Sequence, residues 1–183
     1  FLAAWPARNT LSLATRPSGA AAGFLFAYDT TTRRLSKLLG DLPGLEVLWS
    51  SSGRRLIYST YDTEIRLPRL FSFDPQTRTA EDLGVLTHAS KCAFGSTNET
   101  LIYCGIEARP QSALYPDDWL AGTLSFNDQL WKIDLTTLEK TLLEAPNNQT
   151  FDVIRARVSP DDRFLYFVDK KNNSLWSYAL KGE

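Results

Sequence analysis

The sequence predicts an all-β fold of about four similar units, each made of four antiparallel strands, with the last unit lacking its edge strand. Three observations support this. A short apolar strand repeatedly ends in the same kind of turn, a second hairpin precedes each copy, and the copies recur along most of the chain. Internal similarity at a period of some tens of residues is typical of stacked arrays of supersecondary units.

The first repeated pattern is a strand followed by a tight turn. Its copies are spaced by 45, 60 and 45 residues, and they begin at Leu25, Leu70, Leu130 and Leu175. In each copy an aromatic residue, a small or polar residue and a second large residue follow the Leu, which is typical of a largely covered strand. In the first three copies the strand ends in Asp29, Asp74 or Asp134, whose carboxylate can accept a backbone hydrogen bond two residues on and so start a turn.

The second pattern is a hairpin that precedes the first. Segments 49–59, 94–104 and 158–168 align without gaps, and a degenerate copy lies near Trp5. Their central residues, Gly53, Asn98 and Asp162, tolerate the left-handed backbone that a tight turn requires. Each repeat is therefore expected to hold four strands in about 45 residues, the size of a β-propeller blade. The approximate repeats are 1–44, 45–88, 89–150 and 151–183.

The last repeat also carries a family resemblance. Segment 159–165, Ser-Pro-Asp-Asp-Arg-Phe-Leu, resembles the Ser-Pro-Asp-Gly-Lys/Arg pattern of TolB-type, WD40-like β-propeller repeats, with Asp162 where that family usually has Gly. Segment 50–56 matches more loosely, because Ser51 and Ser52 replace Pro and Asp. The resemblance covers nearly the whole chain and implies a β-propeller, but it implies little about function because this fold hosts many roles.

Two further expectations follow from the predicted blades. Aromatic residues on the strands should pack between blades; they are Phe24, Phe26, Tyr28, Phe71, Phe73, Trp131, Trp176 and Tyr178. The last blade has no fourth strand, and an unpaired edge is a liability. We therefore expect the chain to be the C-terminal part of a longer propeller or to associate with another copy. Because it begins with Phe1 and not Met, we also expect a processed, trimmed or excised chain.

Composition excludes several classes of function. The chain has 183 residues, which suits one domain with a real core. Its net charge is -1 and its basic residues are spread out, so no nucleic-acid partner is expected. No apolar run approaches the length of a membrane span. The single histidine, His88, excludes a multi-histidine zinc site and is expected to be structural. No phosphate, dinucleotide, zinc or calcium motif is present, so we expect no catalytic residue, metal or cofactor.

The two cysteines leave two interpretations open. In the aligned register Cys92 faces Tyr103, so Cys104 would point to the other side of the sheet, and this argues against a disulfide. A slip of one residue would bring both cysteines to one face.

The connections between the second and third strands of each repeat indicate where a site would lie. They fall at 16–23, 62–68, 107–128 and 170–173, and they vary in length while the other turns are short. In a propeller they open on one face, and variation concentrated there is typical of a binding face.

The long insertion supplies the first group of candidates. Tyr115 and Trp119 are either recognition anchors, because Tyr and Trp dominate contact energy at interfaces, or they pack the loop onto its own blade. The Pro-Asp-Asp-Trp run predicts a short helical turn. Asp117 and Asp118 are candidate binding residues, although two adjacent carboxylates rarely hold a cation.

The second connection supplies the other candidates, Tyr61, Asp62, Glu64 and Arg66, with a solvated charged loop as the alternative. Together these features favour a non-enzymatic binding or scaffold module that recognises a protein, peptide or glycan. The alternative is the propeller portion of a larger enzyme, a peptidase or glycan-processing protein, with catalytic residues outside this chain. The cellular location stays open, with a periplasmic or extracellular one favoured.

Overall fold

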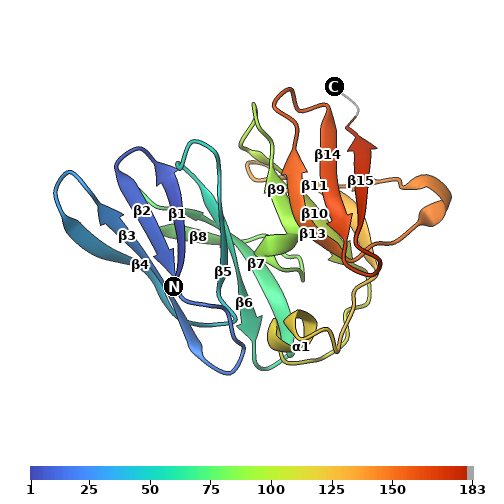
Figure 1. Ribbon diagram of the computed structural model, residues 1–183, viewed down its shortest axis with the longest axis horizontal. Coiled ribbons are helices and arrows are strands. Elements are labelled where there is room, and N and C mark those ends of the chain that lie inside the picture. Colours follow the sequence, from blue (N-terminus) through green and yellow to red (C-terminus); the bar gives the residue numbers. More distant parts are fainter. Residues whose placement is uncertain (181–183) are drawn as a thin grey trace.

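The computed structural model describes residues 1–180, and it consists mainly of antiparallel strands in four sheets (Figure 1). In the first two sheets each strand pairs with the next along the chain. The first sheet contains β1 (Leu2–Ala7), β2 (Thr10–Ala14), β3 (Ala22–Asp29) and β4 (Arg34–Pro43). The second contains β5 (Glu46–Trp49), β6 (Leu56–Asp62), β7 (Leu67–Asp74) and β8 (Thr79–Asp82).

The other two sheets repeat this order. The third contains β9 (Cys92–Phe94), β10 (Leu101–Glu107), β11 (Asp128–Asp134) and β12 (Lys140–Leu143). The fourth contains β13 (Val153–Val158), β14 (Phe164–Asp169) and β15 (Ser174–Ala179). The helical segments are η1 (Ala89–Lys91), α1 (Asp117–Leu120) and η2 (Pro146–Asn148). The predicted all-β architecture of four-stranded antiparallel units is confirmed.

The repeated Asp residues make the turns that the sequence predicts. Oδ1 of Asp74 accepts hydrogen bonds from the backbone N–H groups of Gln76 and Thr77, at 2.7 and 3.2 Å. Asp29 and Asp134 do the same in their own sheets. Each turn closes through a residue of positive φ at the fourth position after the Asp, as at Arg78. The side chain therefore fixes the turn before the outer strand begins.

The turns between the first two strands tie neighbouring sheets together through carboxylates. Asp162 accepts hydrogen bonds from the backbone N–H groups of Ser96 and Thr97, at 2.5 and 2.9 Å. Glu99 similarly accepts from the N–H of Ser52, at 2.6 Å. Asp162 has a φ of 55° and Gly53 one of 68°, as expected for left-handed turn positions. Asn98 was expected to share that conformation but is not among the positive-φ residues; its Oδ1 instead accepts from the N–H of Thr100.

Three apolar layers join successive sheets. The layer between the first and second sheets includes Leu25 and Phe73. The layer between the second and third sheets includes Ile57 and Ile102. The layer between the third and fourth sheets includes Leu130. Of the aromatics expected in such layers, four lie there: Phe71, Phe73, Trp176 and Tyr178.

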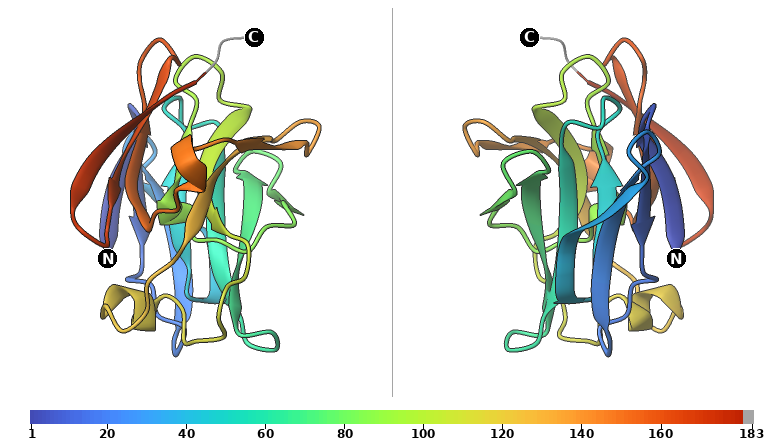
Figure 2. Two further views of the ribbon diagram at one scale, coloured as in Figure 1. Left: turned by 90° about the vertical axis from the view of Figure 1, so that its right-hand side faces the viewer. Right: turned by 90° about the vertical axis from the view of Figure 1, so that its left-hand side faces the viewer.

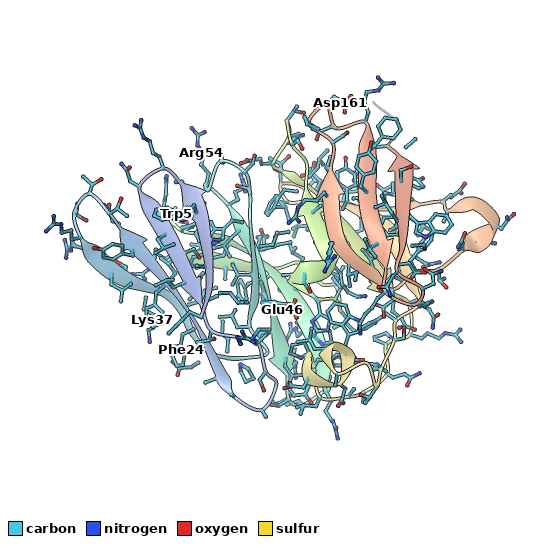
Figure 3. All side chains as sticks on the ribbon, in the orientation of Figure 1. Trp5, Phe24, Lys37, Glu46, Arg54 and Asp161 are labelled. Carbon is cyan, nitrogen blue, oxygen red and sulfur yellow. A yellow bond between two sulfur atoms is a disulfide. The ribbon has the colours of Figure 1, made fainter. Side chains whose placement is uncertain are left out.

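The aromatics of β3 lie outside these layers. Phe24 stacks on Phe26 at a centroid distance of 6.3 Å, and Lys37 lies 5.9 Å from the Phe24 ring. Phe24 and Lys37, which are labelled in Figure 3, project from the outer side of the first sheet. Phe24 and Phe26 thus join none of the layers between the described sheets, and their packing between blades stays a prediction. Trp131 is half-buried and belongs to none of the three layers.

The sheets form an open arc rather than a closed ring. Among residues 1–180, no apolar layer joins the first sheet to the fourth. The fourth sheet has the order β13-β14-β15 and, within the same residues, no fourth strand. The expected missing edge strand is thus confirmed for the part of the chain that the structure describes.

The two cysteines form a disulfide, so the argument against one was wrong. Cys92 pairs directly with Cys104, and Tyr103 pairs with Ala93. The Cα atoms of the two cysteines are 4.1 Å apart, and each residue is 1% exposed. The hairpin turn is closed by the N–H of Gly95 bonding to the carbonyl of Leu101, which shifts the register by one residue from the aligned one. That shift brings both side chains to one face.

Candidate binding face

The connections between the second and third strands of each sheet lie toward one end of the molecule, which we call the loop face. It comprises residues 15–21, 63–66, 108–127 and 170–173. Helix α1 marks this end at the bottom of Figure 1 and of both side views in Figure 2. The turns that carry Arg54 and Asp161 lie at the opposite end (Figure 3). The long insertion 108–127 therefore dominates one face, as expected.

The predicted helical turn is confirmed as α1, and its two acidic residues hold loops in place. Oδ1 of Asp117 accepts a hydrogen bond from the Ser18 hydroxyl at 2.9 Å, and its Oδ2 accepts from the N–H of Gly19 at 2.6 Å. Asp118 accepts from the N–H of Leu114 at 2.8 Å. A Cβ on Gly19 would meet the carbonyl oxygen of Tyr115 at 2.4 Å, so only glycine allows this close approach. The insertion is thus bound to the first sheet's loop.

Tyr115 and Trp119 do not project from the surface. They are 1% and 3% exposed, and they form an aromatic cluster with Tyr61 and Phe126. Tyr61 comes from the second sheet, and Ile154 of the fourth sheet packs against the same cluster. These aromatics are therefore not accessible anchors, and the alternative that they pack the loop down is the better description. They pack the insertion against strands of the second and fourth sheets, however, and not only onto its own blade.

A buried lysine lies beneath this aromatic cluster. Lys91 is fully buried at the end of η1, and its Nζ lies 2.6 Å from Oδ2 of Asp128 and 2.8 Å from Oδ1 of Asp152. The ammonium also lies 4.7 Å from the centroid of Trp119, whose indole N–H donates to Asp152 at 2.9 Å. Buried charges are tolerated when they are paired and hydrogen-bonded in this way. One cation therefore connects the third sheet, the insertion and the start of the fourth sheet.

His88 and Glu46 form a second buried polar contact. Nδ1 of His88 lies 3.2 Å from Oε1 of Glu46, an ion-pair distance without good hydrogen-bond alignment. Glu46 Oε2 accepts from the N–H of Ser90 at 3.2 Å. The His88 ring stacks on Trp119 at 5.0 Å and 13°. The expectation that His88 is structural agrees with this packing, which places its ring against the aromatic cluster.

Burial and pairing set the pKa values of the three buried carboxylates. Burial alone would raise the pKa of Glu46, but attraction to His88 and the Ser90 N–H bond hold it below its usual value. The pKa of Asp152 is likewise lowered, because Lys91 and the hydroxyl of Ser125 outweigh the effect of burial. The pKa of Asp128 is raised, since there burial outweighs the attraction of Lys91.

The second candidate loop is a charged turn. Oδ1 of Asp62 accepts from the N–H groups of Glu64 and Ile65, at 3.0 and 3.2 Å, and Arg69 lies 3.3 Å from its Oδ2. These contacts lower the pKa of Asp62, chiefly through the Ile65 N–H. Glu64 and Arg66 are exposed, and the carbonyl of Arg66 accepts from the N–H of Ala113 at 3.4 Å. The structure thus brings this turn against the insertion.

The accessible part of the loop face coincides only partly with the residues that the sequence favoured, because Glu64 and Arg66 are exposed whereas the three aromatics are buried. Its exposed apolar side chains are Leu120 at 57% and Ile65 at 46%. Exposed charged residues in these loops are Arg16, Glu64, Arg66, Arg109 and Lys171. Residues 1–180 contain no group of three or more acidic, His or Cys side chains placed to hold a metal. What the arrangement offers chemically is a fixed apolar and basic surface.

Sequence reasoning did not find the buried ionic residues. Lys91, Asp128 and Asp152 lie far apart in the chain, and each sits beside a strand end where a charged residue is expected to face solvent. The available signal was weak. Asp128 begins an apolar strand and Asp152 immediately precedes one. Nothing in the sequence indicates that the ends of these two strands meet at one lysine.

Comparisons with known proteins identify the architecture. No protein-family model and no curated protein matches the chain. Among solved structures, TolB from Acinetobacter baumannii is 16% identical with a TM-score of 0.56, covering 95% of this chain and 42% of that one. The Swd1 β-propeller domain of Myceliophthora thermophila is 14% identical with a TM-score of 0.54, covering 94% and 50%. The fold is that of a β-propeller.

A third β-propeller neighbour is part of a much larger protein. The tricorn protease is 12% identical with a TM-score of 0.62, and the match covers 91% of this chain but 15% of that one. The propeller arc described here thus spans half or less of each of these three structures. At these identities the likeness concerns the fold alone. Within the described residues, no helix of this propeller is long and apolar enough to cross a bilayer.

Proposed function

We propose that this propeller is a non-enzymatic binding module that recognises a protein or peptide through its loop face. The observation that carries the proposal is the way insertion 108–127 is held. Its inner side is fixed by buried Tyr115 and Trp119 over Lys91, while Leu120 at the end of α1 remains 57% exposed. A rigidly supported loop loses little conformational freedom on binding, so its exposed side chains can contribute fully to affinity.

The accessible chemistry favours a polypeptide over a glycan. Leu120 and Ile65 are exposed apolar side chains on the loop face, and Arg66 and Arg109 are exposed basic ones. Apolar and charged side chains together are the usual components of a protein interface. The buried disulfide supports a location in an oxidising compartment, in agreement with the periplasmic or extracellular location that the sequence favoured.

The alternative is that the propeller is one part of a larger enzyme. The match to part of the tricorn protease favours it, because that protein's name states a protease activity and the propeller is a small share of its length. Under this alternative the loop face would bind a substrate or an adjoining domain, and the reacting groups would lie elsewhere. Sequence beyond the present chain separates the two: a domain with a Ser-His-Asp arrangement favours the enzyme.

The test places a photoreactive cross-linker at Leu120 and, as a matched control, at Leu35. Leu35 is similarly exposed, at 60%, but lies on β4 away from the loop face. The partner captured from Leu120 is purified and its affinity measured. Changing Leu120→Asp and Ile65→Asp together should weaken binding at least about tenfold, because apolar contacts at an interface centre carry most of the energy. Equal weakening by Leu35→Asp, or no weakening by the double change, would contradict the proposal.

A further inference from the structure

The turns at the end of the molecule opposite the loop face carry an uneven distribution of charge. We call this end the turn face. In the first two sheets it comprises residues 7–10, 29–34, 50–55 and 74–79, and in the other two residues 95–100, 134–140 and 159–164. The first set contains six arginines and two aspartates, whereas the second contains five acidic and two basic residues. The arginines are distant in the sequence and are brought to one end by the fold: Arg8, Arg33, Arg34, Arg54, Arg55 and Arg78.

The guanidinium groups of these arginines are available to an anion. All six arginines are exposed, and none of them forms an ion pair within residues 1–180. The two aspartates of these turns, Asp29 and Asp74, are already engaged, since Oδ1 of each accepts two backbone N–H groups of its own turn. The turns contain arginine and no lysine. The planar guanidinium can bind both oxygens of a carboxylate at once, which makes it the better group for recognising carboxylates.

A groove lies between the turns of the first and second sheets. Its volume is about 570 Å³, and each of the four turns contributes to its lining. Arg34 lines the groove beside Asp29, its partner across β3 and β4. A Cβ on Gly53 would meet the carbonyl oxygen of Pro6 at 2.3 Å, so the turn that carries Arg54 is held closely against β1 at this end (Figure 3). The apolar part of the lining includes Pro6, Leu38, Trp49 and Pro75.

The distribution of charge indicates which kind of anion fits this groove. A flat anionic membrane or a long nucleic acid would also cover the acidic turns of the third and fourth sheets, and repulsion between like charges opposes this. A short acidic segment of a polypeptide can lie in the groove and contact the arginine turns alone. The apolar lining can then hold one of its apolar side chains, which a phosphate backbone or a lipid headgroup does not carry.

We propose that the groove between the turns of the first and second sheets binds an acidic segment of a partner polypeptide, with carboxylates on both sides of an apolar residue. Arg34 and Arg54 bind the carboxylates, and Trp49 contacts the apolar side chain. Clusters of arginine recognise acidic motifs in this way in other proteins. The site lies at the opposite end from the loop face and does not rest on the function proposed for that face.

The test measures the binding of two fluorescein-labelled peptides to the intact protein by anisotropy. One peptide is Glu-Glu-Leu-Leu-Glu-Glu and the other is its neutral counterpart, Gln-Gln-Leu-Leu-Gln-Gln. We expect saturable binding of the acidic peptide and at least about tenfold weaker binding of the neutral one, because an amide cannot form a charge-assisted pair with arginine. The affinity for the acidic peptide should also fall severalfold between about 0.1 M and about 1 M salt, since the Debye length shortens from about 10 Å to about 3 Å.

Two double variants with the same change in net charge locate the site. Arg34→Gln with Arg54→Gln should weaken binding of the acidic peptide at least about tenfold, because two charged partners are lost. Arg16→Gln with Arg109→Gln removes two exposed arginines from the loop face and should leave the affinity within about twofold. All four side chains are exposed, and an unchanged thermal midpoint of each variant would show that it is folded.

The remaining outcomes separate this site from other occupants and from the loop face. Leu120→Asp with Ile65→Asp should leave binding of the acidic peptide unchanged, so the two proposals can fail independently. Equal binding of the two peptides, or equal weakening by the two arginine variants, would overturn the proposal. So would tighter binding of phosphatidylglycerol vesicles or of a single-stranded oligonucleotide than of the acidic peptide. Sedimentation that shows a dimer lost in Arg34→Gln with Arg54→Gln would assign the groove to a second copy of the chain instead.

Discussion

Replacing Lys91 with methionine is the sharpest test of how this propeller is held together. Lys91 is fully buried, and its ammonium is within 2.8 Å of two carboxylates that are themselves at most 1% exposed. Methionine fills a similar volume but removes the ammonium group from these contacts. Leaving buried carboxylates without their partner costs about 3–5 kcal/mol in the free energy of unfolding. A domain stabilised by about 5–15 kcal/mol would lose a large fraction of its stability.

The assay is urea unfolding followed by tryptophan fluorescence, for the wild type, Lys91→Met, and Lys91→Met combined with Asp128→Asn. The double variant removes a stranded charge and should recover part of the loss. Asp128 already has a raised pKa because of its burial, and without Lys91 it should be raised further. A raised folded-state pKa gives stability that is present at low pH and lost as pH rises, so the penalty of Lys91→Met should grow with pH. A loss below about 1 kcal/mol at neutral pH would refute this account, since breaking a buried pair costs several times more.

Three further results are expected. The pKa of Glu46 is held below its usual 4.5, so the carboxylate contributes stability above pH 4.5, and this contribution is lost as pH falls through the lower folded-state pKa. Glu46→Gln should therefore reduce the loss of stability at acid pH in a profile of unfolding free energy against pH. An unchanged acid side of that profile would contradict the role of the His88 contact. Reduction of the Cys92–Cys104 disulfide should lower the midpoint of thermal unfolding, with a loss of about 2–4 kcal/mol; Cys92→Ala with Cys104→Ala should match the reduced protein and show no response to reductant. Gly53→Ala should destabilise by about 1–3 kcal/mol, because its φ is 68° and a Cβ would meet the carbonyl oxygen of Pro6 at 2.3 Å. Gly122→Ala, with a φ of 80° but nothing within 4 Å of the added Cβ, should cost less.

Repeat periodicity was sufficient to predict the fold because each repeat forms its turns through interactions between residues close together in the chain. The Asp at the end of the third strand binds its own turn, and this interaction depends on residues two and three positions away. Such short-range rules survive in the sequence whatever the surroundings are. The register of β9 and β10 was harder, since a one-residue change in the turn after Phe94 decides whether Cys92 meets Cys104 or Tyr103.

The candidate site was only partly predictable, for a reason that concerns distance along the chain. The sequence located the insertion and its helical turn, but it could not show which way Tyr115 and Trp119 face. Their burial depends on Lys91 and Asp152, which come from segments on either side of the insertion and meet only after the sheets have packed. Exposed Leu120 gave no signal of its own, because a single surface leucine in a loop is unremarkable in a sequence.

The carboxylates of Glu99 and Asp162 have a mechanical consequence. They lock the spacing of successive sheets at the end of the molecule opposite the loop face, while the buried ions and aromatics lock it at the loop face itself. A sheet fastened at both ends cannot swing like a hinge against its neighbour. A partner would therefore meet a surface already in its bound shape, and its association rate should be limited by diffusion and orientation with no slow opening step.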